Sequence, residues 1–218
     1  MDYKIGICGI GFVGNAIMNT LINKGFVLNK NLLIYDKYKK IGELENLLHT
    51  DFTFLALPTP FNKNINSYDK TEIESILKFF CENQYNGIII IKSTVEPTTT
   101  KEYTLKFNLK IVHNPEFLSV KTAINDFTNQ KHIILGKENI NIDIIINFYK
   151  IYFPNALISI CNTTESESVK LFVNNFYALK IHFFTELFLL CNKLNINYDN
   201  IKNMMTPETR CRRAIFSL

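Results

Sequence analysis

The sequence predicts an α/β protein with a doubly wound, mainly parallel sheet, followed by a long helix that starts an all-α domain. Three observations lead to this fold class. Short apolar runs alternate with segments of helical periodicity, which is typical of βαβ units. A glycine-rich turn joins the first apolar run to the first helical segment. From about residue 163 the alternation stops, and one helical pattern continues to about residue 194.

The apolar runs and helical segments fix the expected order of elements. Strands are expected at residues 4–8, 32–36, 52–57, 87–92, 109–113, 132–135 and 157–160. Helices are expected at 11–24, 69–82, 98–106 and 140–152, then from 163 to about 194, and from Asp199 through Met205. Right-handed crossovers would place a ligand at the carboxyl ends of the strands.

The motif Gly9-x-Gly11-x-x-Gly14 lies between the first expected strand and the first expected helix. In this position Gly9 permits a tight turn, and Gly11 lets the backbone approach a diphosphate. Gly14 lets the helix pack closely on the sheet. The N–H groups that start the helix, at Phe12 and Val13, suit a diphosphate as well.

The second expected strand ends in Asp36, about twenty residues after the glycine motif. A carboxylate there binds a ribose diol and repels a 2′-phosphate. The two features together predict a Rossmann-like fold that binds NAD rather than NADP. The alternative is a glycine-rich turn of some other α/β protein, with Asp36 as a solvated strand end.

Composition gives no sign of a nucleic-acid or membrane partner. The chain has 218 residues, of which 47 % are hydrophobic and 20 % charged, as expected for a folded protein with a sizeable core. The net charge is +4, and the basic residues are scattered except near Lys202, Arg210, Arg212 and Arg213. The most apolar long stretch, residues 171–191, is interrupted by charged and amide side chains, so a packed helix is expected rather than a membrane span.

The cysteines indicate a reducing compartment. Their number is odd, and they show neither CxxC nor Cys/His ligand spacing, so no metal site is expected; they are Cys8, Cys81, Cys161, Cys191 and Cys211. No signal peptide is recognised at the start, because the glycine motif interrupts the apolar residues. A cytoplasmic location is therefore expected.

Five stretches, in this order, resemble the UDP-glucose/GDP-mannose dehydrogenase family. They are the glycine motif at 9–14, Leu-Pro-Thr-Pro at 57–60, Lys-Ser-Thr-Val at 92–95, Asn-Pro-Glu-Phe-Leu at 114–118 and the helical segment 167–180. The resemblance implies NAD-dependent oxidation of the C6 alcohol of a nucleotide sugar to a carboxylate. It divides the chain into an NAD-binding domain, residues 1–160, and the start of a helical central domain, residues 161–218.

The resemblance also assigns catalytic roles. Lys170 and Asn174 are four residues apart, so they share one face of a helix and could stabilise a developing oxyanion. Glu116 follows a proline at a strand end and would take part in acid/base steps, while Thr94 would hold water or substrate. The competing interpretations are a packed lysine whose amine reaches solvent, an incidental asparagine, and a capping or surface acid.

Further contacts are implied with cofactor and sugar. Pro58 and Thr59 would form a rigid loop against the cofactor, and Thr94 would lie on the nicotinamide side. Phe117 and Leu118 would offer backbone groups and apolar contact to the sugar, together with Glu116, Lys170 and Asn174. A satisfied turn hydroxyl is the alternative for Thr59.

Several positions depart from the family pattern. Val120-Lys121 replaces Glu-Gly, Thr98 replaces a glycine, and Thr185-Glu186 replaces Asn-Glu. The family's nucleophilic cysteine lies in a Gly-Gly-x-Cys-x-Pro-Lys-Asp segment that this sequence lacks, and Cys211 has a different setting.

These departures lead to the expectation of a truncated chain without the C-terminal UDP-sugar-binding domain. The resemblance implies a homodimer that forms through the long helix. The alternatives are a non-catalytic NAD-binding or dimerising remnant and an enzyme of the β-hydroxyacid dehydrogenase type.

Overall fold

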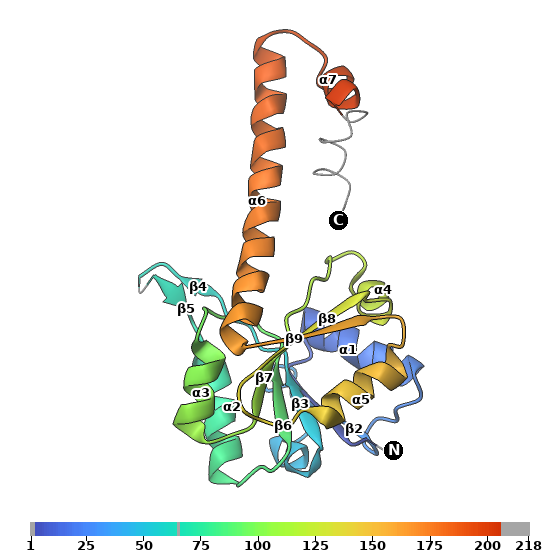
Figure 1. Ribbon diagram of the computed structural model, residues 1–218, viewed down its shortest axis with the longest axis vertical. Coiled ribbons are helices and arrows are strands. Elements are labelled where there is room, and N and C mark those ends of the chain that lie inside the picture. Colours follow the sequence, from blue (N-terminus) through green and yellow to red (C-terminus); the bar gives the residue numbers. More distant parts are fainter. Residues whose placement is uncertain (1–2, 65, 206–218) are drawn as a thin grey trace. The chain divides into compact units, whose positions relative to one another are not determined.

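The computed structural model describes residues 3–64 and 66–205 (Figure 1). The chain divides into two compact units, Met1–Leu171 and Phe172–Leu218. The boundary expected from the sequence, after residue 160, precedes the long helix, whereas the two units divide inside that helix. Arg210, Cys211, Arg212 and Arg213 lie outside the described residues.

A seven-stranded sheet forms the centre of the first unit, in the order β2-β1-β3-β6-β7-β8-β9. Its pairs are parallel except β7 with β8, so the predicted doubly wound, mainly parallel sheet is confirmed. The strands are β1 (Ile5–Cys8), β2 (Leu32–Tyr35), β3 (Phe52–Leu55), β6 (Ile88–Ile91), β7 (Ile111–His113), β8 (His132–Lys137) and β9 (Leu157–Cys161).

Helices cover both faces of this sheet (Figure 1). One face packs against α1 (Phe12–Asn23), α4 (Ala123–Thr128) and α5 (Asp143–Tyr152). The other packs against the 3-10 helix η1 (Leu44–His49), α2 (Thr71–Glu82) and α3 (Thr99–Phe107). The four isoleucines of β6 show how both cores are built, because Ile88 and Ile90 face the first set of helices and Ile89 and Ile91 the second.

Three short elements were not predicted from the sequence: η1, α4 and a two-stranded hairpin. The hairpin pairs β4 (Phe61–Asn62) with β5 (Ser67–Tyr68) in an antiparallel manner. Strands of two residues leave no periodic signal in a sequence. The aromatic rings of Phe61 and Tyr68 meet edge to face across this pair, with centroids 5.6 Å apart.

The connectivity places a ligand site at one end of the sheet. From β1 the chain crosses to β2 on one side, and β3 then pairs with β1 on the other side. The strand order therefore changes direction between β1 and β3. In open α/β sheets, ligands bind outside the carboxyl ends of the strands at such a point.

The second unit contains most of the long helix and the helix that follows. Helix α6 (Thr163–Lys193) begins in the first unit, and α7 (Tyr198–Met205) lies wholly in the second. Within this unit the rings of Phe188 and Tyr198 pack edge to face, with centroids 5.4 Å apart. None of the helices among the described residues is long and apolar enough to cross a membrane.

Candidate cofactor and active site

A cavity of about 560 Å³ lies at the carboxyl ends of five adjacent strands. Its wall runs from the residues after β2, across the glycine turn after β1, to the loops that follow β3, β6 and β7. Among the predicted site residues it is lined by Gly9, Gly11, Phe12, Val13, Asp36, Pro58, Thr59, Thr94 and Glu116.

The three glycines of the motif have different surroundings. Gly9 has a φ of +91°, and a side chain there would also meet the backbone oxygen of Ala56 at 2.6 Å. A Cβ on Gly14 would come within 1.8 Å of the Gly9 oxygen, so Gly14 serves close packing and does not line the cavity. A Cβ on Gly11 would meet no atom within 4 Å. Only at Gly11 would an added side chain enter open space on the cavity wall.

Asp36 is buried and joins the glycine turn to the segment after β2. Its carboxylate accepts hydrogen bonds from the N–H groups of Ile10 at 2.8 Å, Lys39 at 2.8 Å and Tyr38 at 3.0 Å. Burial alone would raise the pKa of Asp36, but these backbone bonds and the Lys39 charge lower it overall. Its burial does not fit the alternative of a solvated strand end.

The residues present fit a dinucleotide. No side chain among those described caps the start of α1, so its first N–H groups remain available to a diphosphate beside the open space at Gly11. Asp36 would hold the adenine-side ribose by accepting its hydroxyl protons. A bound NAD would supply the hydride acceptor.

The loops after β3 and β6 are joined directly beneath the cavity. Ser93 both donates to the Leu57 oxygen at 2.6 Å and accepts from the Leu57 N–H at 3.1 Å. The Thr59 hydroxyl donates to the Thr94 carbonyl at 2.7 Å. The Thr59 hydroxyl is therefore satisfied within the protein, which is the alternative weighed from the sequence, although Thr59 also lines the cavity.

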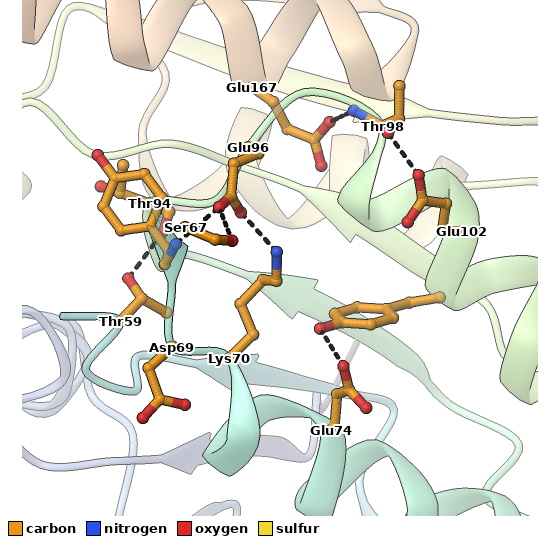
Figure 2. Close-up of polar contacts among 12 residues, drawn as sticks. Thr59, Ser67, Asp69, Lys70, Glu74, Thr94, Glu96, Thr98, Glu102 and Glu167 are labelled. Carbon is orange, nitrogen blue, oxygen red and sulfur yellow. Dashed lines mark hydrogen bonds and ion pairs between the residues drawn. The ribbon is translucent and has the colours of Figure 1, made fainter. Parts of the chain in front are cut away.

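Glu96 forms hydrogen bonds with the β4–β5 hairpin, which follows the Pro-Thr-Pro loop, and with Lys70 just after it (Figure 2). Its carboxylate accepts from the Ser67 hydroxyl at 2.6 Å, the Tyr68 N–H at 2.7 Å and the Lys70 amine at 2.6 Å. Burial would raise the pKa of Glu96, but the hydrogen bonds from Lys70, Ser67 and Tyr68 outweigh it and bring the pKa to about 2.

We expect Glu96→Gln to destabilise the fold in a pH-dependent way. The folded-state pKa lies below the ordinary value of 4.5, so the stabilisation is complete above pH 4.5 and is lost as the pH falls toward 2. At pH 7 the variant should lose about 1–2 kcal/mol, because hydrogen bonds to a charged acceptor are replaced by weaker ones at a partly exposed site. Urea unfolding at pH 7 and pH 3 measures both values. An equal loss at the two pH values would contradict this account.

The start of α3 is held by a carboxylate from α6. Glu167 is fully buried and accepts the N–H groups of Thr98 and Thr100, each at 2.7 Å. Figure 2 shows the contact with Thr98. Thr98 itself has a φ of +83°, a conformation that a β-branched residue adopts only under strain. Its hydroxyl donates to Glu102 at 2.6 Å. Thr98 replaces the family's glycine at this point, and the positive φ is the physical reason that glycine suits it.

Thr98→Gly should therefore raise the free energy of unfolding by about 0.5–1 kcal/mol. Relief of the strain exceeds the sum of the lost Glu102 bond and the added entropy of the unfolded chain. Thr98→Ala is the matched control, since it loses the same hydroxyl but keeps a Cβ at positive φ, and it should not stabilise. Thermal unfolding of the three proteins measures the effect, and an equal gain in both variants would refute the strain argument.

Glu116, on the loop after β7, forms a largely buried ion pair with Lys170 of α6. The Lys170 amine lies 2.8 Å from Glu116 Oε1 and also donates to the Glu116 backbone oxygen. The second carboxylate oxygen accepts the Leu118 N–H at 2.7 Å. The Phe117 ring is partly exposed, and its centroid lies 5.3 Å from the Lys170 amine. The structure thus brings together four residues assigned to the substrate site.

Asn174 belongs to the second unit. It lies one turn beyond Lys170 on α6, and its side chain is exposed.

Lys92 is a further residue of the site; it opens the Lys-Ser-Thr-Val motif, and no role was predicted for it from the sequence. It directly follows the four isoleucines of β6, lines the cavity, and is 2 % exposed. Its amine donates to Asn114 Oδ1 at 2.8 Å. Asn114 is held in turn by two hydrogen bonds. Its Oδ1 accepts from the Tyr149 hydroxyl at 2.6 Å, and its Nδ2 donates to the Ile134 backbone oxygen. A lysine that ends a wholly apolar strand was the signal available in the sequence.

Comparison with known proteins identifies the family. Residues 29–153 match the NAD-binding domain of the UDP-glucose/GDP-mannose dehydrogenase family, and residues 164–217 match its central domain. The chain belongs to this family. Its cofactor is NAD. The family match was expected from the strand-end motifs, and the cofactor from the glycine turn with Asp36; both predictions are confirmed.

Individual relatives agree with the match. UDP-glucose 6-dehydrogenase of Campylobacter jejuni is 32 % identical over 238 residues, which cover 95 % of this chain and 61 % of the relative. This chain therefore spans less than two thirds of that relative's length. A solved UDP-glucose dehydrogenase from Pyrobaculum islandicum has a TM-score of 0.80 at 21 % identity, over 95 % of this chain and 57 % of that one. Mycobacterium tuberculosis 3-hydroxyisobutyrate dehydrogenase has a TM-score of 0.74 at 16 % identity, over 100 % of this chain and 74 % of that one. At these identities the structural likeness concerns the fold.

Proposed function

We propose that this chain supplies the NAD site and part of the catalytic site for oxidation of the C6 alcohol of a nucleotide sugar, of the kind that converts UDP-glucose to UDP-glucuronate. The observation that carries the proposal is that one cavity has residues for the cofactor at one end and an acid/base pair at the other. Glycine turn and Asp36 lie at one end, and Glu116, paired with Lys170, lies at the other. The relatedness to UDP-glucose 6-dehydrogenase supports the substrate class.

The residues divide the work by their chemistry. Lys170 would stabilise the negative charge that develops on the sugar oxygen as the hydride leaves, with Asn174 as a neutral donor. Glu116, in contact with that lysine, would accept and return protons. Thr94 would position water or substrate beside the nicotinamide, and Phe117 and Leu118 would contact the sugar.

The test is NADH formation at saturating NAD with UDP-glucose, UDP-N-acetylmannosamine, GDP-mannose and a small β-hydroxyacid in parallel. Because the chain supplies only part of the catalytic site, we expect at most the first oxidation of one sugar nucleotide, which stops at the aldehyde. This NADH formation should be abolished in Asp36→Ala and retained in Asp143→Ala, an exposed acid on α5 that does not line the cavity. Turnover of the hydroxyacid alone would overturn the substrate class. Saturable NAD binding without turnover of any of the four would favour the alternative, a cofactor-binding and dimerising protein.

We further propose a homodimer that forms through α6 in the cytoplasm. Large apolar side chains of this helix are exposed in the second unit, among them Phe172 at 70 %, Ile181 at 68 % and Leu179 at 67 %. The thiols of Cys8, Cys81, Cys161 and Cys191 are free, which agrees with a reducing compartment. Light scattering should give twice the chain mass, and Ile181→Glu should give a monomer. A monomeric wild-type protein at micromolar concentration would refute the pairing.

A further inference from the structure

Lys92 is a buried cation whose hydrogen-bond partner is a neutral amide. Among the described residues no carboxylate lies within ion-pair distance of its amine, which reaches Asn114 Oδ1 at 2.8 Å and the Pro115 oxygen at 3.5 Å. A buried ammonium group is costly unless a carboxylate neutralises it. An apolar side chain at position 92 would continue the isoleucine strand without this desolvation cost. The presence of a lysine there therefore indicates a functional role.

The groups around Lys92 leave it free to change charge near neutral pH. Burial lowers the pKa of Lys92 to about 7; Glu116 raises the pKa and the nearby Lys170 lowers it. His113 on the neighbouring strand does not titrate in the same range, because burial and the Lys92 charge lower its pKa to about 3. The groups that face the amine from α4 and α5 are the ring of Phe127, 5.7 Å away, and through Asn114 the hydroxyl of Tyr149, whose pKa is raised by burial.

Lys92 lies at the far end of the cavity from Asp36. If Asp36 after β2 holds one ribose and the glycine turn after β1 holds the diphosphate, the second nucleotide would extend over the ends of β3, β6 and β7. Lys92 follows β6 and lines this part of the wall. A bound cofactor would therefore place its nicotinamide ring on the same side of the cavity as Lys92.

We propose that Lys92 discriminates between the two redox forms of the cofactor, with its ammonium form disfavouring NAD⁺ relative to NADH and its neutral form removing that bias. This inference rests on the proposed cofactor site. NAD⁺ and NADH share their phosphates and sugars and differ in the positive charge of the nicotinamide ring. Comparison of the two therefore isolates the interaction between that ring and the lysine.

Linkage makes the effect reciprocal. If the Lys92 charge weakens NAD⁺ binding, bound NAD⁺ must favour loss of the lysine proton by the same factor. Near pH 7, NAD⁺ binding should therefore release a fraction of a proton to the solvent, beyond any release caused by NADH. Oxidation of an alcohol also liberates a proton, and a lysine that loses its own proton when NAD⁺ binds is ready to take one up.

The test is the ratio of the two dissociation constants, Kd for NAD⁺ over Kd for NADH, measured by titration calorimetry from pH 6 to pH 8.5. The ratio should fall about tenfold or more across this range, since two unit charges within about 12 Å of each other at an effective dielectric constant near 20 interact by at least that factor. Lys92→Met removes the titrating group and should give a low, pH-independent ratio. Lys92→Arg keeps the charge at every pH and should hold the ratio at its high value. Lys101→Met, an exposed lysine on α3, should behave as wild type.

Calorimetry in buffers of different ionisation enthalpy counts the protons released in the same titrations. We expect protons to be released when NAD⁺ binds to the wild-type protein, and no such release in either Lys92 variant. A Kd ratio independent of pH in the wild-type protein would overturn the inference while leaving the cofactor site intact. This outcome is measured on the wild-type protein alone, so it does not depend on whether either variant folds. If neither dinucleotide binds, the cofactor site fails, and this inference fails with it.

Discussion

Alanine at two glycines of one motif should damage two different properties of the protein. In Gly11→Ala the new methyl group enters open space at the cavity wall, and the φ of −75° there is allowed for alanine, so stability should be unchanged. NAD affinity should fall about 10- to 100-fold, because the methyl group occupies the place of the diphosphate at a cost of about 1–3 kcal/mol. In Gly14→Ala the methyl group would overlap the Gly9 oxygen, which is backbone and must shift. We expect a loss of about 3 kcal/mol or more in stability.

Urea unfolding and NAD titration on both variants measure the two effects. Gly25→Ala would not serve as a control, because its φ of +94° would add backbone strain to the variant. Neither Gly11 nor Gly14 has a positive φ, so these two glycines differ chiefly in the atoms that surround them. Loss of stability in Gly11→Ala, or unchanged stability in Gly14→Ala, would contradict the assignment of the two roles. The pair thus separates the glycine that faces the ligand from the glycine that packs.

The order of the large elements could be predicted from the sequence because each carries a periodic signal. Strand β6 is a run of four isoleucines, and α6 continues for 31 residues without a glycine or proline to end it. The predicted strand at 52–57 instead ends at Leu55, because Leu57 exchanges hydrogen bonds with Ser93 rather than with a neighbouring strand. The hairpin β4–β5 depends on the distant Glu96, a contact that no local pattern reveals.

The candidate site was partly predictable for the same reason. Residues 9–14, 58–60, 94 and 116 follow different strands, and parallel strands bring their carboxyl ends to one edge. The ion pair between Glu116 and Lys170 could not be predicted, since it joins groups 54 positions apart through tertiary packing. Lys92 was passed over because burial of its amine depends on α4 and α5, which close over it from elsewhere in the chain.

Removing either partner of the Glu116–Lys170 pair should cost far more than removing both. The two side chains are 14 % and 7 % exposed, so Lys170→Met leaves a carboxylate buried beside an apolar chain, and Glu116→Gln leaves a buried ammonium. Each single variant should lose about 3–5 kcal/mol of folding free energy. The double variant should recover most of that loss, because neither charge remains to be buried. Urea unfolding of the four proteins completes a double-mutant cycle. Its coupling energy should be about 5 kcal/mol or more, because the two single losses add up to about 6–10 kcal/mol while the double variant loses little.

The pair between Lys106 and Glu74 serves as the control for this cycle. Its atoms are also 2.8 Å apart, but the side chains are 55 % and 42 % exposed, so solvent screens the charges and its coupling should stay below about 1 kcal/mol. Additive losses at Glu116 and Lys170 would show that the two charges are solvated independently. A double variant as stable as wild type would show that the pair adds nothing net to folding. The carboxylate and the ammonium group would then be kept at the cavity for their chemistry, since an apolar pair would fold equally well.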